Sequence, residues 1–342
     1  MPQVRANLIR VALTLGLGLM LVSVALALLG AAVGSTGLES LAQVWRDPTA
    51  LQIVWDIRLP RTFGAWASGA LLGLAGAVAQ GLFRNPLADP YLLGSASGSS
   101  LGVALALAFF GVSPFATQWL VRLGLTGAAF LGAVGAVLLT LMLAKGVQHT
   151  LKLLLAGVIV GVVLGALVSL TMQVAPDVMQ AMQAFMLGST GFVGWTACVL
   201  MLLVWGLCMV AAWMLSPVLD GLSLGEATAT SLGLPLPQLR AALIVVLALA
   251  TGTAVAQTGL IAFVGLAAPH LVRSVAKTLH GSLILLSSLM GGVLLMAADI
   301  LARWLIAPQE LPVGVLTAVL GGGYLLWLMH RGPTMPTRGS AG

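Results

Sequence analysis

Charged residues are scarce in this sequence. They make up 7% of the 342 residues, while apolar residues make up 60%. A soluble domain carries about 25% charged residues, so these few cannot cover a water-exposed surface of this size. The apolar residues form continuous blocks, many longer than the roughly 20 residues that cross a bilayer as a helix, and they do not alternate as barrel strands do. The sequence therefore predicts an all-α integral membrane protein.

Several signatures of chemistry are also missing. There is no Gly-x-x-x-x-Gly-Lys-Ser/Thr loop, so the chain is not expected to hold ATP phosphates itself. No acid, Lys or Arg lies near the middle of a predicted span, where proton- or sodium-coupled carriers bury such groups. The four histidines are scattered, so we predict no metal site, no other cofactor and no enzymatic centre on this chain. We therefore predict that the chain forms a transport pathway and that a partner protein supplies the energy. A self-sufficient carrier or channel is the alternative.

Cysteine is limited to Cys198 and Cys208, which lie in one apolar run. Ten residues along a helix correspond to roughly 15 Å, which is too far for a disulfide. We therefore predict two free thiols in a helix interior.

Ten apolar blocks are predicted to span the membrane. The stretch 239–276 is too long for one span and short for two, so we divide it near Thr258 and Gly259. The first block is near 23 residues long, which exceeds the 7–15 residues of a signal-peptide core, so we predict an uncleaved span. The predicted spans are residues 11–33, 62–83, 92–110, 119–143, 153–173, 195–215, 239–258, 264–276, 282–305 and 313–330.

The basic residues then fix the orientation. With the N-terminus inside, ten of the 15 Lys and Arg residues fall on the inner face and five on the outer face. This asymmetry follows the positive-inside rule. An even number of spans places both termini on one side, and we predict that this side is the cytoplasm. The five outer residues are Arg46, Arg58, Arg61, Arg122 and Arg303.

Six strings in the sequence are distinctive. The most specific are RNPLADP within residues 81–102 and the block ELPVGVLTAVLGG at 310–322. The others are RLPRTFGAW (58–66), LSLGEATATSLGL (222–234), GLIAFVGLAAPHLVR (259–273) and ADILARW (298–304). Together these strings resemble one family, the FecCD-type permeases of bacterial ABC importers.

The resemblance implies a type II ABC importer permease of about ten helices, with residues 1–342 as one transmembrane domain in the bacterial inner membrane. It also implies a second permease copy, two ATPase subunits that bind ATP and Mg, and a periplasmic binding protein; no nucleic acid is expected. The implied cargo is an iron chelate, either a siderophore complex or haem, with cobalamin as the alternative. FMLGSTG at 185–191 and Gly321–Gly323 depart from the family pattern, so similarity does not fix the cargo.

The segment Ser216–Pro237 is predicted to be the one sizeable inner loop, bracketed by prolines. Ser223 could cap a short helix there, with Glu226 completing a capping box. A solvated loop with a local helix is one interpretation. The resemblance implies the other, in which this segment couples the permease to the ATPase. The predicted coupling residues are Ser223, Leu224, Gly225, Glu226 and Ala227.

The turn at 84–90 has the same two interpretations. Its two prolines and its asparagine predict a rigid hairpin in which Asp89 caps the next helix. Direct contact with the ATPase is the alternative.

A stripe of small residues runs along the fifth span. Gly157, Gly161 and Gly165 repeat every four residues, with Ser169 continuing the series and Met172 following, so the repeat lies on one helix face. Such a face either lets another backbone approach closely or lines a pore. The resemblance implies that this helix lines the translocation path.

Arg58, Arg61 and Arg303 are outer charges that membrane insertion does not require. Local pairing could explain them, Arg58 with Asp56 and Arg303 with Asp299 at helical i,i+4 spacing, as could contact with lipid phosphates. The resemblance implies a different role, a positive ring that receives acidic residues of the binding protein. Guanidinium suits that role because it grips a carboxylate with two parallel bonds.

Overall fold

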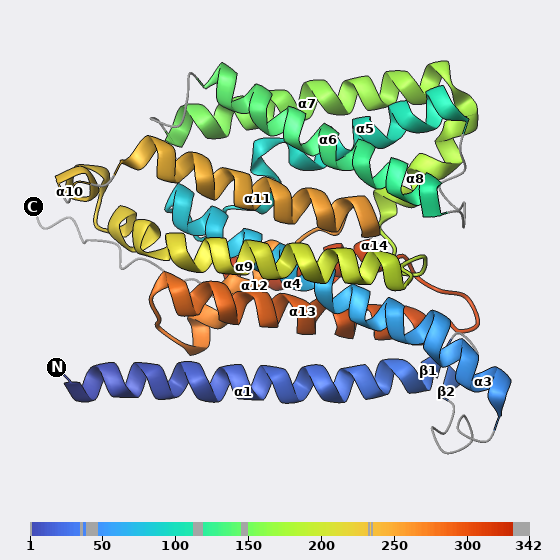
Figure 1. The fold of residues 1–342 in the computed structure, drawn as a ribbon, viewed down its shortest axis with the longest axis horizontal. Coiled ribbons are helices and arrows are strands. Elements are labelled where there is room, and N and C mark those ends of the chain that lie inside the picture. Colours follow the sequence, from blue (N-terminus) through green and yellow to red (C-terminus); the bar gives the residue numbers. More distant parts are fainter. Residues whose placement is uncertain are drawn as a thin grey trace, which may run out of the picture.

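The structure is a helical bundle, given by a computed structural model. It describes residues 2–34, 37–38, 47–111, 119–144, 150–231, 233 and 235–330. Figure 1 shows the long helices lying side by side along one axis of the molecule. They are α1 (Pro2–Ala32), α4 (Leu59–Phe83), α5 (Ser95–Phe110), α6 (Trp119–Leu143), α7 (Thr150–Val174), α9 (Trp195–Ser223), α11 (Leu236–Thr258), α12 (Val264–Val275), α13 (His280–Trp304) and α14 (Val313–His330).

Short elements connect these helices. They are the strands β1 (Val33–Gly34) and β2 (Gly37–Leu38), the helices α3 (Pro48–Ile53), α8 (Met179–Leu187) and α10 (Glu226–Ser231), and the single turns η1 (Val54–Arg58), η2 (Pro90–Leu93) and η3 (Pro176–Val178). The two strands pair antiparallel, Val33 opposite Leu38.

Each of the ten predicted spans coincides with one long helix, which confirms the predicted fold class. By length and composition, seven of the described helices are apolar and long enough to cross a bilayer; α5 and α14 have shorter apolar stretches, and α12 has 12 residues. The predicted division of 239–276 is also correct, because α11 ends at Thr258 and Gly259 follows at φ +69°. The short second piece is α12.

Helix α4 lies at the centre of the bundle, and nearly all of its side chains are buried. The glycines of α4 let the backbones of neighbouring helices approach it closely. A Cβ added at Gly73 would lie 2.2 Å from the carbonyl oxygen of Ser287 on α13, and one added at Gly69 would lie 2.2 Å from that of Gly291. The two backbones therefore touch, as small residues allow between membrane helices.

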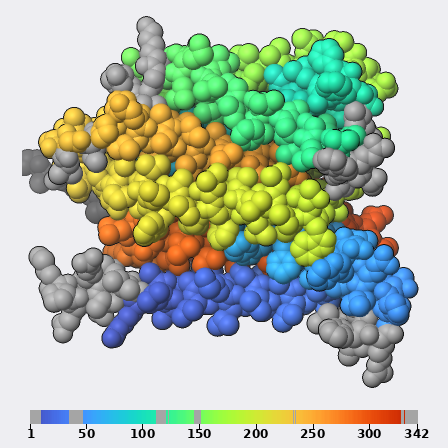
Figure 2. Space-filling view, in the orientation of Figure 1, coloured from blue at the N-terminus to red at the C-terminus, as the bar shows by residue number. Residues whose placement is uncertain are grey.

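Helix α1 lies along one edge of the bundle, as the space-filling view shows (Figure 2). Large apolar side chains on α1 are exposed over its length, among them Leu13, Leu17, Leu21 and Val24. An apolar surface of this extent suits a lipid environment rather than water. Cys198 and Cys208 are buried free thiols in α9, as predicted.

The two ends of the bundle carry different features. Helix α1 begins and α14 ends at the end where α10 lies (Figure 1). We call this the α10 end, and the opposite end, which holds the start of α4 and the end of α13, the Arg61 end. The start of α1 and the end of α14 lie at the same end, which agrees with the predicted placement of both chain termini on one side of the membrane. The assignment of that side to the cytoplasm stays a prediction.

Candidate functional site

Arg61 lies at the start of α4 and binds two carboxylates that are far away in the sequence. Its Nε and Nη2 lie 3.1 and 3.0 Å from Oδ1 of Asp299 on α13. Its Nη1 donates to both oxygens of Glu310, at 3.1 and 2.8 Å. Thr190, between α8 and α9, also donates to Asp299. We call Arg61, Thr190, Asp299, Arg303 and Glu310 the Arg61 cluster.

Arg303 completes this cluster and fixes the end of α1. It pairs with Asp299 one turn earlier on α13, as the i,i+4 spacing predicted. It also donates to the carbonyl of Gly30 at 3.1 Å and lies 3.2 Å from the hydroxyl of Thr62. Arg58 donates to the neighbouring carbonyl of Ala31 at 3.3 Å. The two arginines thus occupy carbonyls that the last turn of a helix leaves without intrahelical partners.

The burial of these arginines corrects one part of the prediction. Arg58 is 7% exposed, Arg61 8% and Arg303 1%, so they do not form an open positive ring. They are buried because each guanidinium finds carboxylate or carbonyl partners, the condition under which a charge leaves water. Contact between these residues and a binding protein stays a prediction. Glu310 and Thr190, which the sequence did not single out, are the partners that the fold supplies.

Helix α10 is a short helix in the predicted coupling segment, but the segment differs from the predicted loop. Helix α9 continues through Pro217 as far as Ser223, so residues 216–223 are helical. The predicted capping box is wrong. Ser223 donates its hydroxyl to the carbonyl of Asp220 at 2.6 Å, and Glu226 turns away toward other partners.

Glu226 attaches α10 to the body of the bundle. Its carboxylate lies 2.5 Å from Nη2 of Arg240 on α11 and 3.8 Å from Arg84. Ala229 is buried, whereas Ser223, Leu224, Ala227, Thr228 and Thr230 are exposed. Gly225, before the helix, has φ +105°, a conformation that favours glycine. Helix α10 is therefore held from one side and presents its other side outward.

The turn at 84–90 lies beside α10 through Arg84. Asn85 accepts the N–H of Leu87 at 2.9 Å, and Asp89 accepts that of Tyr91 at 2.8 Å. Asp89 therefore caps η2, the turn that leads into α5, which confirms its predicted role. Burial raises the pKa of the Asp89 carboxyl, and the bond from Tyr91 opposes this rise. The rigid hairpin is present, and its contact with an ATPase stays a prediction.

The small-residue stripe on α7 changes character along the helix. A Cβ added at Gly157 would lie 2.0 Å from the carbonyl oxygen of Leu92, so this glycine serves packing. At Gly161 the nearest atom lies at 3.7 Å, and at Gly165 the space is open. Ser169 is exposed and Met172 half-buried. The role of the stripe in translocation stays a prediction, and its open part starts at Gly161.

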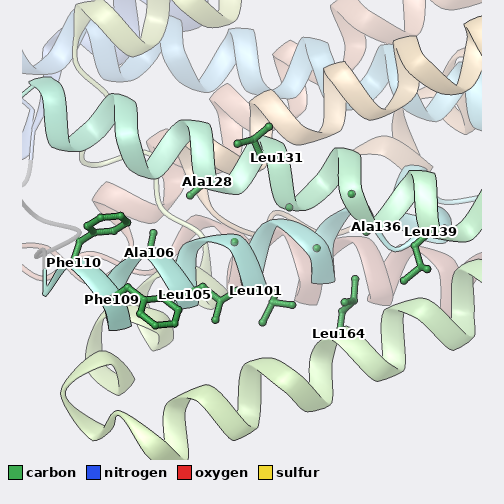
Figure 3. A pocket seen from close by; sticks show the side chains of 14 residues that line it. Leu101, Leu105, Ala106, Phe109, Phe110, Ala128, Leu131, Ala136, Leu139 and Leu164 are labelled. Carbon is green, nitrogen blue, oxygen red and sulfur yellow. The ribbon is translucent and has the colours of Figure 1, made fainter.

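An apolar cavity of about 520 Å³ lies between α5, α6 and α7. Figure 3 shows Leu101, Leu105 and Phe109 of α5 lining it, with Leu131 of α6 and Leu164 of α7. The lining residues are all apolar, so the cavity offers hydrocarbon contacts and nothing that would pair with a charged chelate. We therefore do not assign the cargo to it.

Comparison with known proteins decides the family. Residues 14–331 match the FecCD transport family. The chain belongs to the FecCD transport family. A FecCD relative, the hemin transport system permease protein HmuU of Yersinia pestis, is 37% identical over 94% of this chain and 97% of its own. The vitamin B12 import system permease protein BtuC of Escherichia coli O157:H7 is 38% identical, covering 84% and 86%.

A solved structure shares the fold of this FecCD chain. It is described as a metal-chelate type ABC transporter in an inward-facing conformation. The two chains superpose with a TM-score of 0.83 at 31% identity, over 93% of this chain and 99% of the other. The helical fold of the described residues is therefore that of a type II ABC importer permease. The protein is a multi-pass membrane transport subunit.

Proposed function

We propose that this chain is the membrane permease of an ATP-driven importer that carries an iron chelate, a siderophore complex or haem, into the cytoplasm. The match to the FecCD transport family over residues 14–331 carries this proposal. Cobalamin is the alternative cargo, because the relative named for hemin and the relative named for vitamin B12 have nearly the same sequence identity to this chain.

The assembly that we propose has a second copy of the chain, two ATPase subunits that bind ATP and Mg, and a periplasmic binding protein. Helix α10 suits the ATPase contact, because Glu226 holds it to the bundle while Ala227 and Thr228 face outward. Exposed apolar residues lie on α7, such as Val162, and on α14, such as Val319, and a second copy of the chain could cover such residues.

The Arg61 end is proposed to receive the binding protein through Arg58, Arg61 and Arg303. A pair at the rim of such a contact contributes about 1 kcal/mol, and a desolvated one costs roughly 2–5 kcal/mol on truncation. Single alanine variants should weaken docking moderately, and the triple variant should nearly abolish it. High salt should imitate this loss only in part, because salt screens buried charges such as these much less than exposed ones.

The cargo is tested by the ligand that co-purifies with the partner binding protein, identified by absorption spectrum and mass. Haem or a ferric siderophore bound to the binding protein supports the main proposal. The same compound, added unlabelled, should then compete with the labelled cargo for uptake. A corrinoid with cobalt, and no iron complex, would replace the main proposal with cobalamin import.

A further inference from the structure

Arg61 holds two carboxylates that differ in their access to water. Asp299 is fully buried between Arg61 and Arg303, whereas the Glu310 side chain is 33% exposed. Glu310 comes from residues 305–312, the largely exposed connection between α13 and α14. Among the charged members of the Arg61 cluster, Glu310 is therefore the one that an approaching protein meets first.

Formal charges in this cluster balance. Arg61 and Arg303 carry two positive charges, and Asp299 and Glu310 carry two negative charges. Removing Glu310 alone would leave Arg61 with a surplus positive charge in a largely buried position, which is costly. A second carboxylate that arrives as Glu310 leaves would keep the balance.

We propose that Glu310 occupies on Arg61 the place that a carboxylate of the binding protein takes, so that docking exchanges one carboxylate for the other. This inference rests on the proposed docking role of Arg61. The geometry suits an exchange because Nη1 of Arg61 reaches both Glu310 oxygens, at 3.1 and 2.8 Å, while Nε and Nη2 stay on Asp299. One side of the guanidinium is thus anchored and the other is exchangeable.

The exchange would reach α14 and the α8–α9 connection. Glu310 lies four residues before Gly314, whose N–H donates to the carbonyl of Gly188 at 3.3 Å. Thr190, two residues after Gly188, donates to Asp299. Release of Glu310 removes a contact that holds residues 305–312, which lead into α14, against Arg61 at the start of α4. Docking and the position of α14 are thereby coupled.

The test is binding-protein affinity, measured on the assembled transporter in nanodiscs, of Glu310→Gln against Asp177→Asn. Asp177 is an exposed acid in η3 at the same end, so its variant controls for the loss of one negative charge. Glu310→Gln should lower the dissociation constant about fivefold, since a pair with one partly exposed partner contributes about 1 kcal/mol. Asp177→Asn should change it by less than about twofold because that charge is screened. Glu310→Ala should repeat the effect, and basal ATPase activity serves as the folding control.

Arg61→Ala separates this inference from the docking proposal. In the Arg61→Ala background, Glu310→Gln should no longer change affinity. If Arg61→Ala weakens docking but Glu310→Gln behaves like Asp177→Asn, the exchange is wrong and the docking role stands. If Arg61→Ala leaves docking unchanged, both the docking role of Arg61 and the exchange are wrong.

Discussion

Asp299 is the residue on which the Arg61 cluster depends, because it is fully buried and shared by two arginines. Asp299→Asn keeps the shape but leaves both guanidinium groups without their buried counter-ion. Breaking a buried pair typically costs 3–5 kcal/mol, so we expect a loss of about that size in the free energy of unfolding. The melting midpoint of the purified protein checks this. Asp177→Asn is the matched control, and equal midpoints for the two variants would contradict the account.

Only part of this cluster was visible in the sequence. The Asp299–Arg303 pair follows from i,i+4 spacing, which is local. The Arg61–Glu310 pair joins residues 249 positions apart, and the periodicity of a sequence cannot predict such a long-range contact. Burial was likewise missed, because a charge near a span end looks exposed until its partners are known. Ser223 was misread as a cap because α9 was expected to end before it.

At the scale of elements, the close contact between α4 and α13 offers a test of the packing. Gly73→Val places side-chain atoms against the carbonyl of Ser287, where even a Cβ would lie at 2.2 Å. Overpacking of this kind costs roughly 1–3 kcal/mol or more, and here backbone must move. Gly135→Val on α6 is the control, since an added Cβ there meets nothing within 4 Å. We expect loss of folded protein in size-exclusion chromatography for the first variant only; similar yields would refute the close contact.

Helix α10 gives the second prediction at this scale. Gly225 is a poor test position, because its φ of +105° strains any side chain. Ala227 is exposed and helical, so Ala227→Trp should leave the fold intact. The bulky side chain should prevent α10 from binding to the ATPase. Transport should fall at least about tenfold, the effect of losing roughly 1.4 kcal/mol of coupling. Leu279→Trp, also exposed at the α10 end, controls for bulk, and wild-type transport by Ala227→Trp would argue against coupling through α10.

Elements were predicted better than contacts, and the reason is physical. An apolar run is a local property, so each of the ten predicted spans coincides with one described helix, even where that helix is short, as α12 is. Pro217 was taken as a helix end, yet α9 continues through it, because neighbouring groups satisfy the freed backbone in membrane helices. The packed and open parts of the α7 stripe could not be separated by sequence, since the difference depends on where Leu92 lies.

At the scale of the whole molecule, the orientation in the membrane is open to direct measurement. On a Cys198→Ala/Cys208→Ala background, single cysteines replace Ile306 at the Arg61 end and Leu279 at the α10 end, both exposed. An impermeant thiol reagent should label only the Ile306 variant in intact cells, and both after permeabilisation. Labelling of the Leu279 variant from outside would invert the proposed topology.

The central claim is that this chain is a pathway without its own energy source. The most direct test is uptake of labelled haem or ferric siderophore into proteoliposomes that contain the permease, its ATPase and its binding protein. We predict uptake only when ATP and Mg are present together with all three proteins, and none by the permease alone. Uptake by the permease alone, driven by a proton, sodium or cargo gradient, would contradict the account and identify the chain as a self-sufficient carrier or channel.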